Sequence, residues 1–582
     1  MSKYLLQITI GPVQAFIASA RKLRDLWFGS YLLSELSKTV ARSLDEQDAE
    51  LIFPAIKNPD DLQANSDLIV ANKILAILEL EGDPDSIIAK ARAAWESHWK
   101  TLGEGTIEKM TRDRISFNEP LFRKQLMDEG EFYAAWVEWD GDYQDAKARL
   151  EKLLAGRKNL RAFEVPAWNG KDIPKNSLDG KREAVIGDAK TEIKGLLKKS
   201  ERLDCLGCIK RFYPLRPDQQ QMLFDDLADI ALTPYLKGLE KTRNAHLLAK
   251  LKVFEASLSG SQFRIPESVQ RQRPKYGNLT VQSELLYASK EELGDRAFSC
   301  LIDLISNKAA GPPHKYACLL LGDGDDMGSV INAIKEPEEH KQFTEALSQF
   351  AATVKNLICS DEYDGSLIYS GGDDVLAYVP LHTMLECADE IRKAFTEIMA
   401  PVCMRITKKQ PTFSIGMAIV HHSEQLSYAL ELVRKAERLA KEKGGKNALA
   451  IIRHKRGGSD ICITGKWENG TTEEIIPRLN AMCSLYKERK LPTRLAYQLY
   501  EARVSAGKDI QFNLSEEGQI LIPQNASSAL ILKIFDQKEH QEDLKVLLKN
   551  QTSIEDLSDQ LVIAWDISKA RKMSRGEFND EI

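Results

Sequence analysis

The 582-residue sequence lacks any uninterrupted apolar run long enough for a helix to cross a bilayer. The apolar run near its amino terminus, Tyr4–Ile10, has the length of a strand and is followed by Gly11-Pro12, which is unlike a secretory signal. We therefore expect a cytoplasmic protein with no membrane partner.

The sequence also lacks a surplus of basic residues. Its formal net charge is −6, so it gives no indication of a globally basic surface for nucleic acid. Cysteines number only nine, an odd count, and most stand singly in apolar segments, which predicts reduced thiols. Hydrophobic and charged fractions of 43% and 29% are typical of a globular protein, and the length predicts about three to five domains.

The stretch Tyr369–Tyr378 consists of two short apolar runs joined by Gly-Gly-Asp-Asp, which predicts a β-hairpin with two carboxylates in its turn. Gly371 and Gly372 permit a tight reversal and let a phosphate approach the main chain. Asp373 and Asp374 are hard oxygen ligands, suited to Mg²⁺ or Mn²⁺ carrying a nucleoside triphosphate. An acidic turn alone is usually a solvated hairpin tip, so the neighbouring segments decide between the two interpretations.

A second acidic segment lies upstream of this turn. The apolar run Tyr316–Leu321 is followed by Gly-Asp-Gly-Asp-Asp, which is typical of a buried strand with Asp323 at its carboxyl end. If this strand pairs beside the hairpin, Asp323 and Asp373 face one another across a metal site. The order of the predicted elements, β-α-β-β-α-β with a further α-β, fits the ferredoxin-like palm of nucleotide polymerases and cyclases.

Three groups of motifs carry a family resemblance. Ser414-Ile415-Gly416 followed by Ala440–Asn447 resembles the later part of a GGDEF-type nucleotidyl cyclase palm. Gly322–Gly328 paired with the Gly-Gly-Asp-Asp hairpin resembles the large palm-polymerase subunit of type III CRISPR effector complexes. The amino-terminal stretches Ile10–Ile17 and Ala20–Ser30 resemble the opening of that subunit in the Cmr (type III-B) class.

The predicted fold class is α+β, with two ferredoxin-like palm domains, a zinc-knuckle-like insertion and helical domains. The predicted parts are a degenerate palm at 1–165, the insertion at 166–215, a helical connector at 216–305, the catalytic palm at 306–457 and a helical carboxyl-terminal domain at 458–582.

The first part is predicted to hold strands and a cationic helix. The helix Val13–Leu26 carries Arg21, Lys22 and Arg24, interpreted as a solvated face with Asp25 as local partner, or alternatively as a phosphate contact. Its predicted strands are Tyr4–Ile10, Leu68–Lys73 and Tyr133–Trp139. The resemblance implies that this palm completes the nucleotide pocket across a pseudo-symmetric interface, without metal ligands of its own.

The insertion contains a single Cys-x-x-Cys, formed by Cys205 and Cys208. Two such pairs would indicate structural zinc, whereas one pair is a weak signal. Related subunits carry a second pair upstream, and Asn176 and Asp179 stand where those cysteines are expected. Asparagine is a poor zinc ligand, so we predict that this module keeps the shape of a knuckle without zinc.

Many members of this family carry an amino-terminal HD-type nuclease, which is marked by an adjacent His-Asp pair. None of the nine histidines is followed by aspartate. We expect no HD-type DNA cleavage by this chain, whether its lineage lost that domain or the sequence was truncated.

The predicted catalytic and metal-binding residues are Asp323 and Asp373, with Asp374 in support. They are expected to hold two divalent ions, Mg²⁺ or Mn²⁺, that bridge a triphosphate and activate an attacking 3′-hydroxyl for in-line attack on the α-phosphorus. Pyrophosphate is the expected leaving group.

Five further residues are predicted to bind the nucleotide phosphates. Ser370, Gly371 and Gly372 lie in the hairpin beside them. Lys441 or Lys446 is expected to neutralise charge on the leaving group, with an ordinary solvated lysine as the alternative for Lys441.

The resemblance implies the substrate and the partners. It implies an antiviral subunit that joins ATP 3′-5′ into cyclic oligoadenylate when its complex pairs guide RNA with target RNA. The expected partners are the other subunits of a type III-B complex and, through them, guide and target RNA. A related product such as a conjugate of adenylate with S-adenosylmethionine uses the same acidic ligands, so the motif leaves the product open.

Two other functions remain open from the sequence. The palm can serve only to bind ATP and scaffold its partners, although all three predicted ligands are intact. A free-standing diguanylate cyclase is the second, and it is disfavoured by the Gly-Gly-Asp-Asp turn and by the amino-terminal motif.

Overall fold

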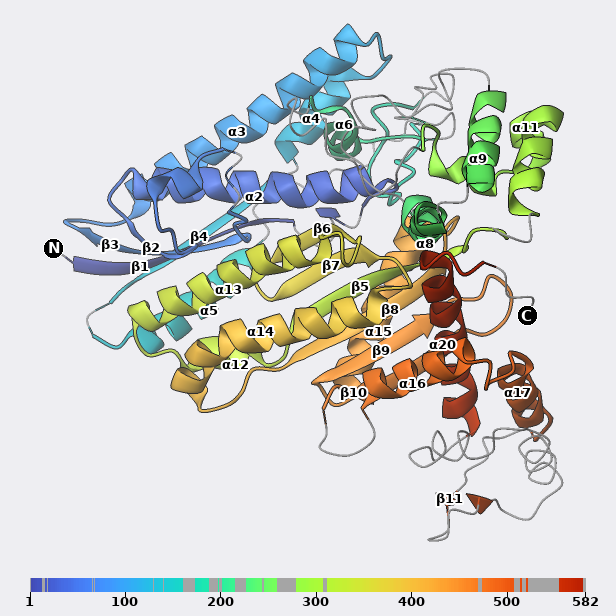
Figure 1. The fold of residues 1–582 in the computed structure, drawn as a ribbon. Helices are drawn as coiled ribbons and strands as arrows, with labels where there is room; N and C mark the ends of the chain where they lie inside the picture. Colours follow the sequence, from blue (N-terminus) through green and yellow to red (C-terminus); the bar gives the residue numbers. More distant parts are fainter. Residues whose placement is uncertain are drawn as a thin grey trace.

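Two antiparallel-rich sheets organise the computed structural model (Figure 1). The structure describes residues 2–12, 16–17, 19–64, 66, 68–128, 130–139, 141–160, 173–187, 197, 201–214, 227–242, 245–258, 279–306, 311–468, 474–506, 513–514, 520–521 and 554–578. Residues 13–15 and 18 of the predicted amino-terminal helix, and much of the predicted helical carboxyl-terminal domain, lie outside these ranges. No helix in the described part of the chain is both long and apolar enough to span a membrane.

The first sheet has the strand order β2-β3-β1-β4, with every neighbouring pair antiparallel. This is the order of a ferredoxin-like βαββαβ unit. The elements of this unit are β1 (Ser2–Gly11), α2 (Leu23–Asp45), β2 (Glu50–Phe53), η1 (Pro59–Leu62), β3 (Lys73–Leu80), α3 (Asp85–Arg112), α4 (Glu119–Asp128), β4 (Glu131–Glu138) and α5 (Tyr143–Asn159).

Two predictions of local structure in this unit were wrong. The stretch predicted as strand Leu68–Lys73 contains no strand before Lys73, where β3 begins and runs to Leu80. The described amino-terminal helix α2 begins at Leu23 and continues far beyond the predicted end at Leu26.

The second sheet has the order β10-β9-β8-β5-β7-β6, and its segment β6-β7-β5-β8 repeats the order of the first sheet. β9 then adds parallel to β8, and β10 adds antiparallel to β9. The elements are β5 (Tyr316–Gly324), α12 (Met327–Ala333), α13 (Pro337–Ile358), β6 (Ser366–Gly371), β7 (Asp374–Val379), α14 (Met384–Thr407), β8 (Phe413–His421), α15 (Leu426–Glu442), β9 (Ala448–Arg453) and β10 (Ile461–Lys466). The predicted fold class of two ferredoxin-like palms is therefore confirmed.

Helices connect and flank the two palms. Those between them are α6 (Cys205–Phe212), α8 (Leu227–Thr242), α9 (Ala245–Ser257), η4 (Ser283–Tyr287) and α11 (Lys290–Ile305). Those after them are α16 (Ile475–Lys487), α17 (Arg494–Ala506) and α20 (Ile554–Ser574), with the short strands β11 (Asn513–Leu514) and β12 (Ile520–Leu521). The domain boundaries stay predictions, but the palm sheet itself includes β10, which begins after the predicted end of the palm at residue 457.

The second sheet is buried on both faces, as its long apolar strands predict. Successive residues of β5 point to opposite faces. Cys318 and Leu320 belong to the apolar cluster that includes α13 and α14, whereas Ala317 and Leu319 belong to the cluster with α15 and the first turn of α2. Figure 1 shows α13 and α14 along one side of this sheet and α2 above the β6–β7 hairpin.

The two palms share one apolar cluster. Leu5, Ile77 and Val137 of the first sheet belong to the same buried cluster as Leu320 and Phe343 of the second palm. The opposite face of the first sheet, covered by α2 and α3, forms a separate cluster. The first palm therefore packs against the second through a dry interface rather than through a flexible linker alone.

Helix α15 approaches β8 at a glycine. A Cβ atom on Gly416 would overlap the backbone nitrogen of Glu437 and lie 2.6 Å from the carbonyl carbon of Ala436. The absence of a side chain at this position therefore fixes how closely α15 lies against the sheet, and with it the position of Glu437.

We expect Gly416→Ala to lower the free energy of unfolding by about 1–3 kcal/mol, because backbone atoms cannot move aside as a flexible side chain does. The matched control is Gly156→Ala in α5, where an added Cβ meets open space. The control is expected to stabilise the protein by up to about 1 kcal/mol, since alanine favours a helix over glycine. Urea unfolding measures both, and equal stability of Gly416→Ala and wild type would contradict the close approach.

Candidate active site

The β6–β7 hairpin turns at Gly372-Asp373, and Gly371 pairs with Asp374 across it. Gly372 has φ +68°, a conformation that glycine adopts without strain and that suits a tight hairpin turn. The predicted hairpin with two carboxylates at its tip is confirmed.

The two glycines of the turn have different surroundings. No described atom lies within 4 Å of the place where a Cβ on Gly372 would stand, so this residue borders open space. Gly371 is covered by Tyr369, whose hydroxyl donates a 3.3 Å hydrogen bond to the Gly371 carbonyl. Ser370 is buried, and its hydroxyl makes no hydrogen bond to any described residue. Of the three predicted phosphate contacts in the hairpin, Gly372 is the accessible one.

The end of β5 lies directly beside the hairpin. Gly322 pairs with Val375 on β7, and Asp323 pairs with Ser414 on β8. A Cβ on Gly324 would lie 3.1 Å from the Cβ of Asp373. The structure therefore brings Asp323, Asp373 and Asp374 to one edge of the sheet.

The two hairpin carboxylates are electrostatically uncompensated. Burial raises the pKa of Asp373 to about 6, and the charge of Asp374 adds to this effect. Burial likewise raises the pKa of Asp374 to about 6. A bound cation relieves both costs, because it replaces lost hydration and offsets the repulsion of the like charges.

Lys441, near the end of α15, is paired with Asp323. Lys441 forms an ion pair with the Asp323 carboxylate, and its Nζ also lies 2.9 Å from Glu437 Oε1. Burial lowers the pKa of Lys441, and the charge of Lys446 acts in the same direction. Lys441 is thus held inside the cluster rather than on an exposed helix face.

Glu437 is a carboxylate of this site that the sequence analysis missed. Burial raises its pKa, and the charge of Asp374 contributes next. Its position one helical turn before Lys441 is the sequence signal that could have found it, since residues four apart lie on the same helix face.

A fourth aspartate, Asp325, has a structural role. Its carboxylate accepts hydrogen bonds from Thr412 Oγ1 and Ser414 Oγ, each at 2.8 Å, and from the backbone of Asn447 at 2.9 Å. These bonds join the end of β5 to the loop after α15. Lys446, in that loop, is exposed and lies 2.5 Å from Asp326.

The donor set suits a hard divalent cation, with one rearrangement. Carboxylates such as those of Asp323, Asp373 and Asp374 are the ligands that Mg²⁺ and Mn²⁺ prefer, and a bound cation would offset the burial that raises the pKa of the last two. Within the described ranges, no three His, Cys, Asp or Glu side chains stand close enough together to hold a metal ion. Lys441 would have to leave Asp323 for all three aspartates to share one.

The first palm contributes cations near this edge. The charge of Lys73, the first residue of β3, lowers the pKa of Asp373 and so opposes the effect of burial. Burial lowers the pKa of Lys158, and Lys73 adds to this effect, while Glu131 opposes it. Sequence analysis missed all three residues.

The internal repeat is the signal that could have found them. Helices α5 and α15 are both 17 residues long, and Lys158 and Lys441 are each the sixteenth residue of their helix. At the start of the third strand, the first palm has Lys73 where the second has Asp374.

The Cys-x-x-Cys module lies away from this edge. Cys205 and Cys208 are fully buried, and burial raises the pKa of Cys208. Asn176 donates a 3.3 Å hydrogen bond to Asp179 Oδ1 and accepts one of 2.8 Å from the backbone of Leu178. That this module lacks zinc stays a prediction.

The interpretation of the amino-terminal cations as a solvated helix face was wrong in one respect. Asp25 is buried and pairs with Arg211 of α6 rather than with a neighbouring cation of its own helix. Arg24 donates a 3.3 Å hydrogen bond to the carbonyl of Tyr213. The long-range partners on α6 could not be seen from spacing within one helix.

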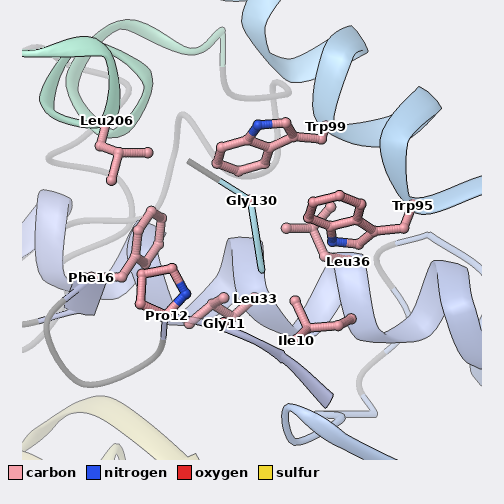
Figure 2. A pocket seen from close by; sticks show the side chains of 10 residues that line it. All are labelled: Ile10, Gly11, Pro12, Phe16, Leu33, Leu36, Trp95, Trp99, Gly130 and Leu206. Atoms are coloured by element: carbon pink, nitrogen blue, oxygen red, sulfur yellow. The ribbon is translucent and has the colours of Figure 1, made fainter. Parts of the chain in front are cut away.

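A separate apolar cavity of about 10 Å³ lies under Gly11-Pro12. Figure 2 shows Phe16 and Pro12 on one side of it, Trp95 and Trp99 on another, and Leu206 of α6 above Phe16. About one water molecule fits in such a volume, so it is not a nucleotide site.

Comparison with known proteins gives two family matches. The model of "Cas10/Cmr2, second palm domain" matches residues 315–450, and that of "CRISPR-associated protein Cmr2, N-terminal" matches residues 5–104. The "CRISPR system Cmr subunit Cmr2" of Pyrococcus furiosus is 27% identical over 568 residues, which cover 80% of this chain and 63% of that protein. The chain thus spans less than two thirds of the length of this relative.

Solved structures match over nearly the whole chain. A type III-B Cmr-beta complex in the apo state contains a chain with a TM-score of 0.66 and 15% identity, covering 97% of this chain and 82% of that one. The Cmr-beta complex bound to cognate target RNA gives a TM-score of 0.63 at 14% identity, with coverage of 97% and 83%. At such identities the likeness shows the fold.

We expect Asp373→Asn to raise stability at pH 7–8 in the absence of divalent metal. A pKa above that of the unfolded chain means that the folded protein binds the proton more tightly, so ionisation between about pH 4 and 6 costs stability. Removing one charge should recover about 1–3 kcal/mol at pH 7–8 and much less at pH 4. Thermal unfolding in EDTA across this pH range measures the difference.

The matched control is Asp325→Asn, which loses acceptor capacity in a fully hydrogen-bonded site. This control is expected to destabilise the protein at pH 7, since a buried donor is left unpaired. Destabilisation by Asp373→Asn at pH 7 would contradict the uncompensated charge of the hairpin.

Proposed function

We propose that this chain is a Cas10/Cmr2-type subunit of a type III-B CRISPR effector complex and a metal-dependent nucleotidyltransferase, a proposal supported by the family and relative matches. The observation that carries the proposal is the placement of Asp323, Asp373 and Asp374 at the same edge of a cyclase-like palm. Its substrate is ATP, and its product is a cyclic oligoadenylate or a related adenylate conjugate, including one with S-adenosylmethionine.

Asp323, Asp373 and Asp374 would hold Mg²⁺ or Mn²⁺. When bound, the ions supply positive charge to the triphosphate and lower the pKa of the attacking 3′-hydroxyl. The negative charges of Asp373 and Asp374 would attract cations and metal-bound nucleotide from solution to this edge. Gly372 leaves room beside the turn for a phosphate to approach the main chain.

Lys441 would have a second role in the reaction. Its ammonium group pairs with Asp323, and it would offer positive charge to the leaving pyrophosphate. Glu437 lies one helical turn before Lys441 and holds its ammonium group beside Asp323.

The first palm supplies further positive charge. Lys73 acts on Asp373 from the neighbouring domain, and Lys158 lies close enough to Lys73 for their charges to interact. Two cations on this side suit the triphosphate of a second nucleotide, which a reaction joining two ATP molecules requires. The other subunits, guide RNA and target RNA are the proposed partners, in line with the related complex bound to cognate target RNA.

The first test is product formation by the assembled complex. The full chain, reconstituted with its partner subunits, guide RNA and target RNA, is incubated with labelled ATP and Mg²⁺ or Mn²⁺, and products are resolved by mass. We expect adenylate products whose yield falls at least about 100-fold in the double variant Asp373→Ala, Asp374→Ala. A parallel reaction with S-adenosylmethionine distinguishes the two product classes.

The matched control is Glu338→Ala with Glu339→Ala, an adjacent carboxylate pair in the first turn of α13. It should leave product formation unchanged. Retained ATP binding without product in wild type would favour the scaffold function, and preference for GTP in competition would favour a diguanylate cyclase.

A second prediction concerns Lys441. Lys441→Met should lower kcat by about 100-fold, because it removes a cation from the leaving group. Lys435→Met on the exposed face of the same helix is the control and should retain activity. Equal activity of the two variants in steady-state assays would exclude a role for Lys441 in the reaction.

A further inference from the structure

The segment that leads into α2 lies between α6 and the catalytic hairpin. Ile17, Ala20 and Leu23 belong to the apolar cluster that contains Ile368 and Tyr369 of β6. The same cluster includes Leu321 of β5 and Leu439 of α15, both next to the site residues. Figure 1 shows α2 with α6 on one side and β6 on the other, and α2 contacts both.

Close packing alone does not hold this segment. The cavity under Gly11-Pro12 borders Phe16, so part of its ring faces empty space rather than neighbouring atoms (Figure 2). A void of this kind removes dispersion contacts from the residues that line it. Contacts other than apolar packing must therefore hold the segment in place.

Lys210 of α6 provides such contacts. It is buried, and its ammonium group donates hydrogen bonds to the carbonyls of Phe16 and, at 2.9 Å, Ser19. The same group lies 4.3 Å from the centre of the Phe16 ring. One buried cation thus fixes two backbone carbonyls and one side chain of the segment.

Arg211 fixes the end of the segment. Its Nε donates a 2.7 Å hydrogen bond to Asp25 Oδ1, and its Nη2 lies 2.5 Å from Asp25 Oδ2. Glu201 accepts a 3.2 Å hydrogen bond from Nη1 of the same guanidinium. All three side chains are buried, so removing the Arg211 guanidinium would leave the like charges of Asp25 and Glu201 buried together.

We propose that α6 positions the catalytic hairpin through this segment, and that Lys210 and Arg211 are positioning residues for the Gly-Gly-Asp-Asp turn. The step from hairpin order to catalysis rests on the proposed function. The line of contact runs from α6 through Phe16, Ser19 and Asp25 to β6, which ends at Gly371 just before the turn with the two aspartates.

The test compares two buried lysines. Lys210→Met removes the ammonium group and keeps the length of the side chain. The matched control is Lys38→Met, because Lys38 is equally buried, pairs with Glu35 and donates to the carbonyl of Ser66. Lys38 lies 15 residues beyond Leu23 in α2, about 22 Å along the helix.

Amide hydrogen exchange of the full chain reports on residues 366–379 without any turnover. We expect exchange in this hairpin to be at least about tenfold faster in Lys210→Met. This variant loses the charge-assisted hydrogen bonds that hold the neighbouring segment in place against the hairpin. Lys38→Met should leave the hairpin as protected as in wild type. Equal protection of the hairpin in all three proteins, or an equal loss in both variants, would overturn the proposal.

Activity of the assembled complex is the second measurement. Lys210→Met should lower kcat for adenylate formation by about tenfold or more, because a misplaced catalytic group loses its alignment. Its KM for ATP should change by less than about twofold, whereas Lys38→Met should change neither value. Absence of product in wild type would sink the proposed function, while the exchange measurement still decides the role of α6.

A conservative variant covers the case in which Lys210→Met fails to fold. Arg211→Lys keeps the positive charge but cannot reach Asp25 and Glu201 with the same planar fork. Faster exchange in both the segment 16–26 and the hairpin would support the proposal. Faster exchange in the segment with an unchanged hairpin would refute it.

Discussion

The structure depends on keeping several carboxylates near one another in a partly buried site. Asp373 and Asp374 are adjacent and partly buried, and burial raises the pKa of each. The charge of Lys73 from the first palm opposes this effect at Asp373. Lys441 of α15 pairs with Asp323, while Asp325 accepts hydrogen bonds from neutral donors.

Duplication of one fold gives the two palms opposite charge at matching places. Both sheets have the same order of four strands, and α5 and α15 have equal length with a lysine at the same position. The third strand begins with Lys73 in one palm and with Asp374 in the other. A single fold thus carries a cation in one palm and an anion in the other at the same structural position.

The sequence was most informative where a local pattern decides the structure. The hairpin at Gly371–Asp374 and the buried strand ending in Asp323 followed from turn chemistry and apolar runs. Glu437 and Lys158 do not stand out in such a pattern, and only the helical spacing to Lys441 and the repeat of the two palms point to them. The pairing of Asp25 with Arg211 joins residues 186 positions apart, so no spacing rule could show it. Strand β3 was misplaced because its Lys73 start is preceded by residues with similar β-propensity.

The shared apolar cluster makes the two palms mechanically one body. Leu5 and Val137 are buried among the same side chains as Leu320 and Phe343, so neither sheet can open without exposing part of the other. Separate expression of either palm would expose its share of this apolar cluster to water, and such a fragment should aggregate or bind chaperones. Evolution can therefore trim or append segments around this pair far more easily than it can split the pair between two genes.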